Sequence, residues 1–218
     1  MIYVMMNIDH ILLNKYNSII EYVEKSGAER AIIAGGAIRD MVLNKPINDI
    51  DVFFVGELDV EKLKQFFNIT EDTKDQPDFY PKSDWKLSYN NVKLPDLPYN
   101  IQLIEVKKDK RKTYPASNTL MNHVLTFGCD LSMMIYSPLF GFIIYPEALQ
   151  DMFLEKLTFN SKLQNPEYMY KIKNKYPDYM VDNQSAFEYD PSYTKTPKGF
   201  FQDAIHLQAG QAAVLDDV

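Results

Sequence analysis

Two aspartates separated by a single residue, Asp49 and Asp51, have the spacing that most directly suggests chemistry. They open residues 49–55, a segment that becomes wholly apolar after the second carboxylate, as in an inner strand with one functional end. Residues two apart in a strand project from the same face, so the carboxylates would meet. Like charges held that close repel unless a cation lies between them, and such oxygen ligands suit Mg²⁺ or Mn²⁺. An isolated pair of this kind also occurs at solvated strand ends, so the pair alone leaves both interpretations open.

A second cluster consists of Gly35 and Gly36, followed one helical turn later by Arg39. The glycines stand between an apolar run, residues 31–34, and a helix predicted for residues 37–43. Glycines let the backbone approach a ligand closely, and the start of a helix offers unpaired N–H groups to a phosphate. The fork of Arg39 suits phosphate oxygens. A Gly-Gly pair can also be a tight turn and nothing more.

The elements that would position these residues follow from hydrophobic periodicity and from turn residues. We predict helices at residues 9–26, 37–43, 59–67, 118–125 and 200–215. Strands are predicted at residues 31–34, 49–55, 85–89 and 101–106, with a turn at 90–91 and a hairpin turn at 137–141 inside the apolar stretch 131–145. The carboxylate pair and the glycine pair then lie at neighbouring ends of adjacent strands, the layout that phosphoryl transfer requires.

Composition limits the class of protein. The chain has 218 residues, of which 46% are hydrophobic and 24% charged, with a formal net charge of −7. It has one cysteine, which excludes an intramolecular disulfide framework. The apolar N-terminal stretch is too short to cross a bilayer and lacks the features of a secretory signal, so we expect a cytoplasmic protein without a membrane partner. The acidic charge argues against attraction to nucleic acid over the whole surface and leaves a local basic patch as the alternative.

The segment GGAIRDMVLNKPINDIDVFF resembles the signature of the polymerase-β-like nucleotidyltransferase superfamily, and is most similar to the head domain of tRNA nucleotidyltransferases and poly(A) polymerases. Downstream, Asp130 and Ser132 fall on the Asp and Thr of a second family segment. The likeness covers about residues 28–160. It implies an α+β nucleotidyltransferase fold, with a small mixed β-sheet flanked by helices. It also implies a head-like domain at residues 1–160 and a short C-terminal appendage or tail at residues 161–218.

The resemblance implies transfer of a nucleoside monophosphate from a nucleoside triphosphate to an acceptor hydroxyl with two metal ions. Asp49 and Asp51 would hold Mg²⁺ or Mn²⁺, and Gly35, Gly36, Arg39 and Asp130 would contact the nucleotide. The family uses a third carboxylate from a neighbouring strand. Glu105, the only acidic residue in the strand predicted at 101–106, is our candidate, with an ordinary surface glutamate as the alternative.

The acceptor that the resemblance implies is an RNA or tRNA 3′ end. A basic cluster just beyond Glu105, formed by Lys107, Lys108, Lys110 and Arg111, could guide the triphosphate or an RNA backbone, or could be a solvated loop. Cys129 and Met134 replace family residues near Asp130, and the residues after 160 are too few for the helices that grip tRNA in full-length enzymes. We therefore also consider a protein or small-molecule hydroxyl as acceptor, and a non-catalytic nucleotide-binding protein.

Overall fold

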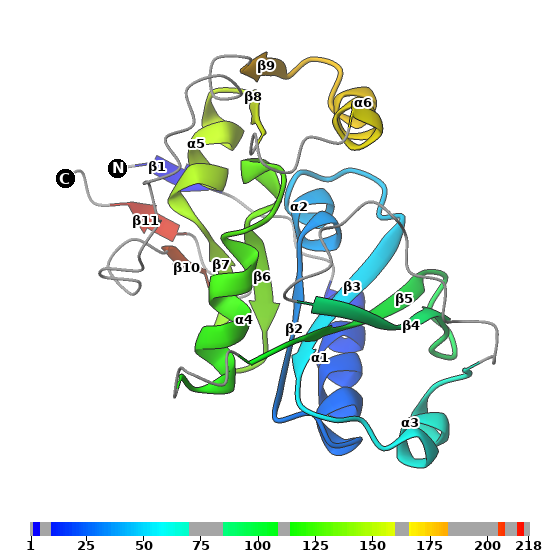
Figure 1. Ribbon diagram of the computed structural model, residues 1–218. Helices are drawn as coiled ribbons and strands as arrows, with labels where there is room; N and C mark the ends of the chain where they lie inside the picture. Colours follow the sequence, from blue (N-terminus) through cyan, green and yellow to red (C-terminus); the bar gives the residue numbers. More distant parts are fainter. Residues whose placement is uncertain are drawn as a thin grey trace.

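A seven-stranded sheet organises the protein in a computed structural model that describes residues 2–4, 10–69, 85–108, 114–159, 166–182, 205–207 and 213–215 (Figure 1). The pair β3 and β5 is parallel, whereas the other neighbours in this sheet are antiparallel. The sheet is therefore mixed, as predicted. In spatial order its strands are β10 (Ile205–Leu207), β7 (Gly141–Ile144), β6 (Met134–Ser137), β2 (Arg30–Ala34), β3 (Asp49–Val55), β5 (Asn100–Val106) and β4 (Trp85–Val92).

Helices cover both faces of this sheet. On one face α1 (His10–Lys25) packs beside α3 (Val60–Phe66), where the rings of Tyr22 and Phe66 stack with centroids 4.5 Å apart. On the other face α4 (Ala116–Val124) places His123 5.3 Å from the ring centroid of Phe53. The helix predicted at residues 59–67 is confirmed as α3, and Asp59 caps it by accepting hydrogen bonds from two backbone N–H groups.

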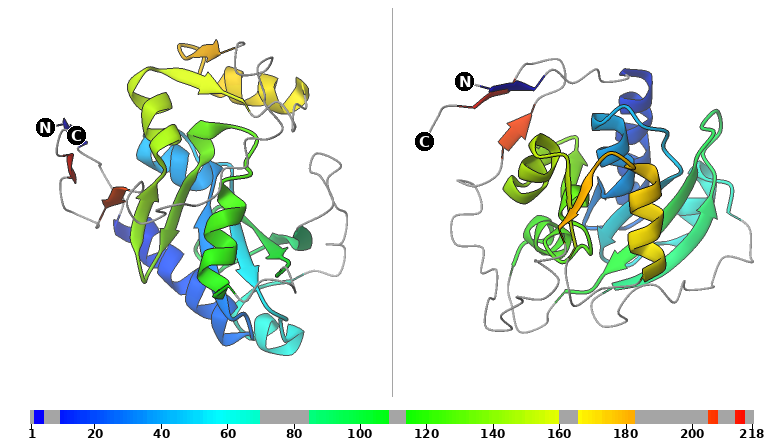
Figure 2. Two further views of the ribbon diagram at one scale, coloured as in Figure 1. Left: turned by 60° about the vertical axis from the view of Figure 1, so that its left-hand side comes forward. Right: turned by 90° about the horizontal axis from the view of Figure 1, so that it is seen from above.

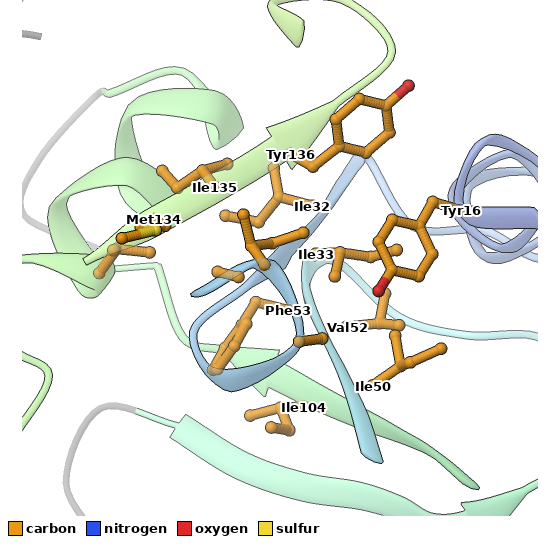
Figure 3. Close-up of a cluster of buried hydrophobic side chains, with 14 of the residues drawn as sticks. Tyr16, Ile32, Ile33, Ile50, Val52, Phe53, Ile104, Met134, Ile135 and Tyr136 are labelled. Carbon is orange, nitrogen blue, oxygen red and sulfur yellow. The ribbon is translucent and has the colours of Figure 1, made fainter. Parts of the chain in front are cut away.

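Alternation along β3 separates its apolar face from its polar end. Ile50, Val52 and Phe54 are buried on the side of α1, and Figure 3 shows Ile50 and Val52 near the ring of Tyr16. Asp49 and Asp51 face the opposite side and are partly exposed. The buried core thus fixes which way the two carboxylates point.

Two sequence-based expectations differ from the structure along the sheet. The turn predicted at residues 90–91 is an irregularity inside β4, whose pairing with β5 shifts register on both sides of Tyr89, and Asn91 has φ of 54°. A β-bulge uses the same turn residues as a hairpin without ending the strand. The helix predicted at residues 200–215 is wrong for its described residues, because β10 extends the sheet along β7, and β11 (Ala213–Leu215) pairs with β1 (Ile2–Val4).

The described residues between 146 and 182 form a small layer at one end of the molecule (Figure 2). It contains α5 (Pro146–Phe153), β8 (Lys156–Thr158), α6 (Pro166–Lys175) and β9 (Met180–Asp182), with β8 and β9 paired in parallel. The domain boundary at residue 160 stays a prediction, although strand pairs β8–β9 and β7–β10 span it. Within the described ranges, no helix combines the length and apolar character needed to cross a membrane.

Candidate active site

The register of β2 and β3 brings the glycine pair beside the aspartate pair. In this antiparallel pair Arg30 lies opposite Val55 and Ile33 opposite Val52. Continuing the register, the end of β2 and the glycines that follow it come level with the start of β3, where Asp49 and Asp51 lie. The predicted adjacency of these two clusters is confirmed. A ligand in contact with the turn would also face the carboxylates.

Gly35 shapes the turn between β2 and α2 (Gly36–Val42). Its φ is 78°, a conformation that residues with a side chain rarely adopt. A Cβ atom here would lie 3.2 Å from Cε2 of Phe127, closer than an ordinary contact. The Gly35 N–H donates to the Met134 carbonyl at 3.0 Å, so this group is committed to the sheet. The N–H groups that lack an intrahelical acceptor begin at Gly36.

Asp51 is the most perturbed carboxyl group at the site. Burial and, to a smaller extent, the charge of Asp49 raise its pKa to about 7, against the positive charges of Lys171 and Arg39, which act in the opposite direction. Desolvation and a like charge penalise the same ionised state, and a bound cation relieves both. The pair therefore has the chemistry of a ligand set for a hard divalent cation.

Arg39 does not lie open to a triphosphate, contrary to our expectation. Only 4% of its surface is exposed. Its Nε donates to Asp40 Oδ1 at 2.8 Å and to the Tyr176 hydroxyl at 2.9 Å, and its Nη1 donates to Ser132 Oγ at 2.8 Å. Burial lowers its pKa, but Tyr176 and Asp40 more than offset this effect and hold the pKa above the usual range. Arg39 therefore joins three chain segments from within.

Helix α6 is fixed to the site through this buried arginine network. The Tyr176 hydroxyl donates to Asp40 Oδ1 at 2.6 Å, and Lys175 forms an ion pair with Asp40 Oδ2. Tyr168 shares a side-chain hydrogen bond with Ser132. Figure 1 shows α6 beyond the end of the sheet at which α2 and the start of β3 lie. Local sequence patterns do not predict this contribution of α6 to the site.

A weak signal for α6 is present in the sequence. Pro166 is a favoured first residue of a helix, and Tyr168, Ile172 and Tyr176 recur every four residues. The residues between them are polar except for Met169 and Tyr170, so the helical period is faint. Only long-range hydrogen bonds reveal that this helix belongs to the site.

Glu105 is not the third carboxylate that we predicted. In the parallel pair of β3 and β5, Asp51 lies opposite Gln102, whereas Glu105 lies opposite Phe54. Three residues along a strand amount to roughly 10 Å. Glu105 also shares the face of its partner Phe54, which is opposite to the face of the aspartates. The side chain level with Asp51 is the amide of Gln102.

The donor set therefore fits one cation better than two. Among the residues that the structure describes, no group of three or more His, Cys, Asp or Glu side chains gathers as a metal site. Asp49 and Asp51 supply two carboxylates, and Gln102 and Asn100 stand in register with them on β5. Amide oxygens are acceptable ligands for Mg²⁺ but carry no charge to hold a second ion.

Of the remaining predicted site residues, some lie close to the carboxylate site and others lie far from it. Asp130 lies in the short 3-10 helix η1 (Asp130–Ser132), which the bond from Arg39 to Ser132 ties to the site. Lys107 and Lys108 follow β5 at its other end, roughly 16 to 20 Å along the chain direction from the level of Asp51. There Lys108 pairs with Glu29. Lys110 and Arg111 lie outside the described residues.

Known structures share this fold. The structure of a CCA-adding enzyme in complex with ATP superposes with a TM-score of 0.52 at 14% identity, covering 82% of this chain and 40% of that one. The CCA-adding enzyme of Thermotoga maritima, complexed with tRNA, gives a TM-score of 0.53 at 15% identity over 80% of this chain and 40% of that one. The predicted nucleotidyltransferase head fold is confirmed by these similarities.

Sequence relatives extend the comparison. A segment of 55 residues is 46% identical to the CCA-adding enzyme of Leuconostoc citreum and covers 25% of this chain and 13% of that protein. The chain thus spans less than half the length of the relatives it matches. Residues 9–137, well over half of the chain, match the family described as Gabija anti-defense 2. This protein, whose carboxylate pair stands beside a glycine turn on a nucleotidyltransferase fold, belongs to the Gabija anti-defense 2 family.

Proposed function

We propose that the protein is a cation-dependent nucleotidyltransferase, which transfers a nucleoside monophosphate from a triphosphate to an acceptor hydroxyl. The observation that carries this proposal is the register of β2 and β3. It puts the turn at Gly35 next to Asp49 and Asp51, and the pKa of Asp51 is raised to about 7 by burial and by its neighbour. A carboxylate that is desolvated beside a second carboxylate is costly to a fold, which favours a functional reason for the pair.

Each group has a role in this proposal. Asp49 and Asp51 hold Mg²⁺ or Mn²⁺, which, when bound, supplies charge neutralisation for the phosphates and polarises the attacking oxygen. The turn at Gly35 and Gly36 gives the triphosphate close access to the backbone. Arg39 keeps η1, α2 and α6 in fixed positions rather than gripping phosphate itself. Asp130, beside Ser132, is retained as a nucleotide contact.

Two acceptor classes are supported by different observations. Neighbours of the same fold are described in complexes with ATP, CTP and tRNA, which favours an RNA 3′ end as acceptor. The family description, Gabija anti-defense 2, instead favours a hydroxyl on a protein component of that defense system. The basic residues Lys107 and Lys108 lie away from the carboxylates, which removes the nearest support for an RNA backbone there.

The test is transfer of label from each α-³²P nucleoside triphosphate, with Mg²⁺ or Mn²⁺, to total RNA and to a protein extract from cells that carry the defense system. Wild-type protein is compared with the Asp49→Asn, Asp51→Asn double variant. The matched control is Glu57→Gln, Glu61→Gln, which removes the same charge at exposed positions near α3. We expect label on one macromolecule with wild type and control only. Equal labelling by the double variant would refute the proposal.

A stability measurement separates loss of chemistry from loss of fold. Neutralising Asp49 and Asp51 removes a repulsion, so without a divalent cation the double variant should be as stable as wild type or more stable. An unstable double variant would show that the carboxylates are structural. Labelled RNA identifies the first acceptor class, and labelled protein the second.

A further inference from the structure

The site needs a cation for the triphosphate, and Arg39 is already engaged. Its guanidinium is buried and bonded to Asp40, Ser132 and Tyr176. To reach a ligand it would have to leave the Asp40 carboxylate, which is itself only 2% exposed. Breaking such a buried pair leaves an uncompensated buried charge, which costs more than one phosphate contact returns. Any positive side chain that supplements the bound metal ion at the phosphates therefore has to come from another residue.

One face of α6 carries three side chains directed at the site. Tyr168 reaches Ser132, and Lys175 reaches Asp40. Lys171 stands three residues after the first and four before the second, the spacing of neighbours on one helical face. Lys171 therefore lies on the face of α6 from which Tyr168 and Lys175 contact the site. The side chain is nevertheless exposed to solvent.

Lys175 and Lys171 thus differ in whether their ammonium groups are available to a ligand. Lys175 has only 17% of its side chain exposed and is paired with Asp40, so it holds the helix in place. Lys171 is exposed on the same face of α6, so its ammonium group is accessible to a ligand. A lysine ammonium is a compact charge that binds phosphate without requiring a fixed plane.

We propose that Lys171 binds the phosphate groups of the incoming triphosphate, with α6 held over the turn by Lys175 and Tyr176. This inference rests on the proposed function, since it assigns a phosphate contact to the same site. It moves the role that the sequence assigned to Arg39 onto a helix beyond residue 160. The competing explanation is that Lys171 only offsets the charge of Asp51.

The experiment is calorimetric titration with inorganic tripolyphosphate and Mg²⁺, a probe that needs no base recognition, and with adenosine. Lys171→Met should weaken tripolyphosphate binding about tenfold, the equivalent of one charge-assisted hydrogen bond. Lys171→Arg should retain most of the affinity. Lys64→Met, which removes one charge from exposed α3 at the far end of the molecule, should leave the affinity unchanged. Adenosine binding should not respond to any of these variants.

The outcomes separate this inference from the proposed function. If wild type binds tripolyphosphate and Lys171→Met binds it equally well, Lys171 only balances charge and the inference is overturned while the function stands. If Lys64→Met weakens binding as much as Lys171→Met, the effect is general electrostatics and the inference also fails. If wild type does not bind tripolyphosphate with Mg²⁺, both proposals fail. Because Lys171 is exposed, the melting temperature of its variants should match wild type, which excludes misfolding as the cause.

Discussion

Replacing Tyr176 by phenylalanine tests whether α6 is fixed to the site by its buried hydroxyl. Tyr176 is 1% exposed, and its ring also packs under the Arg39 guanidinium, 5.1 Å from centroid to Cζ. Phenylalanine keeps the ring and removes one oxygen. Burial raises the pKa of Tyr176, so the hydroxyl remains protonated and acts as the donor to Asp40. The substitution therefore deletes two hydrogen bonds from a packed interface: the one that the hydroxyl donates to Asp40, and the one that it accepts from Arg39 Nε, which also donates to Asp40.

The magnitude follows from the partners that remain. A hydrogen bond to a charged group contributes about 1.5 to 3 kcal/mol. Arg39 Nε keeps its 2.8 Å bond to Asp40 Oδ1, and Lys175 keeps its pairing with Asp40, so no buried charge is left alone. We therefore expect Tyr176→Phe to lower the free energy of unfolding by about 2 kcal/mol, in the lower half of that range.

The assay is urea denaturation followed by circular dichroism, together with amide hydrogen exchange along α6. A loss of about 2 kcal/mol corresponds to roughly thirtyfold faster exchange if the helix opens locally. Tyr170→Phe is the matched control, because it removes the same atom from an exposed tyrosine, 70% accessible, on the same helix. A change below about 0.5 kcal/mol for Tyr176→Phe, or equal changes for both variants, would refute the anchoring role.

Three further predictions, two of them with a matched control variant, test the geometry of the site. Asp40→Ala leaves a buried guanidinium without its carboxylate and should lower the free energy of unfolding by about 3 to 5 kcal/mol in urea; a loss under 1 kcal/mol would contradict the network. Gly35→Ala, at φ 78°, should cost about 1 to 3 kcal/mol in the same assay, whereas Gly36→Ala, whose added Cβ meets only ordinary contacts, should cost less. Gln102→Glu should tighten Mg²⁺ binding about tenfold by calorimetry, and Glu105→Gln should leave it unchanged; the reverse pattern would show that the strand register is misassigned.

Local patterns in the sequence predicted most of the scaffold around the site. The apolar run at residues 31–34 and the aspartate-led segment at 49–55 correspond to β2 and β3, and the hairpin turn at 137–141 joins β6 to β7. The predictions of these elements are correct because each element is specified by residues a few positions away, through alternation, a glycine pair or a Ser-Pro turn. The adjacency of the glycines and the aspartates follows from the same short connection.

Local patterns do not predict contacts between segments that are distant in the sequence. Arg39 was expected to face phosphate, but Tyr176, 137 residues later, takes part of its hydrogen-bonding capacity. Residues 166–175 contain few apolar side chains, so nothing local marks α6 as a helix that packs on the site. The strand β10 pairs with the sheet edge although its short sequence suits a helix equally well. In each case a tertiary partner determines the outcome.

The assignment of Glu105 failed for a reason that bears on the chemistry. Within one strand, sequence spacing determines which side chains share a face of the sheet. It does not determine which of the two faces they share, or which residues of the neighbouring strand lie opposite them. The choice of Glu105, the only acidic residue in β5, assumed a register in which Glu105 lies level with the aspartates. The observed pairing of Asp51 with Gln102 excludes that register. The two carboxylates then hold at most a −2 charge with neutral amides beside them, so a triphosphate has to bring compensation of its own or find it on α6. The exposed ammonium of Lys171, on the face of α6 from which Tyr168 and Lys175 contact the site, is our candidate for this compensation, so one electrostatic argument covers both the missing carboxylate and the added helix.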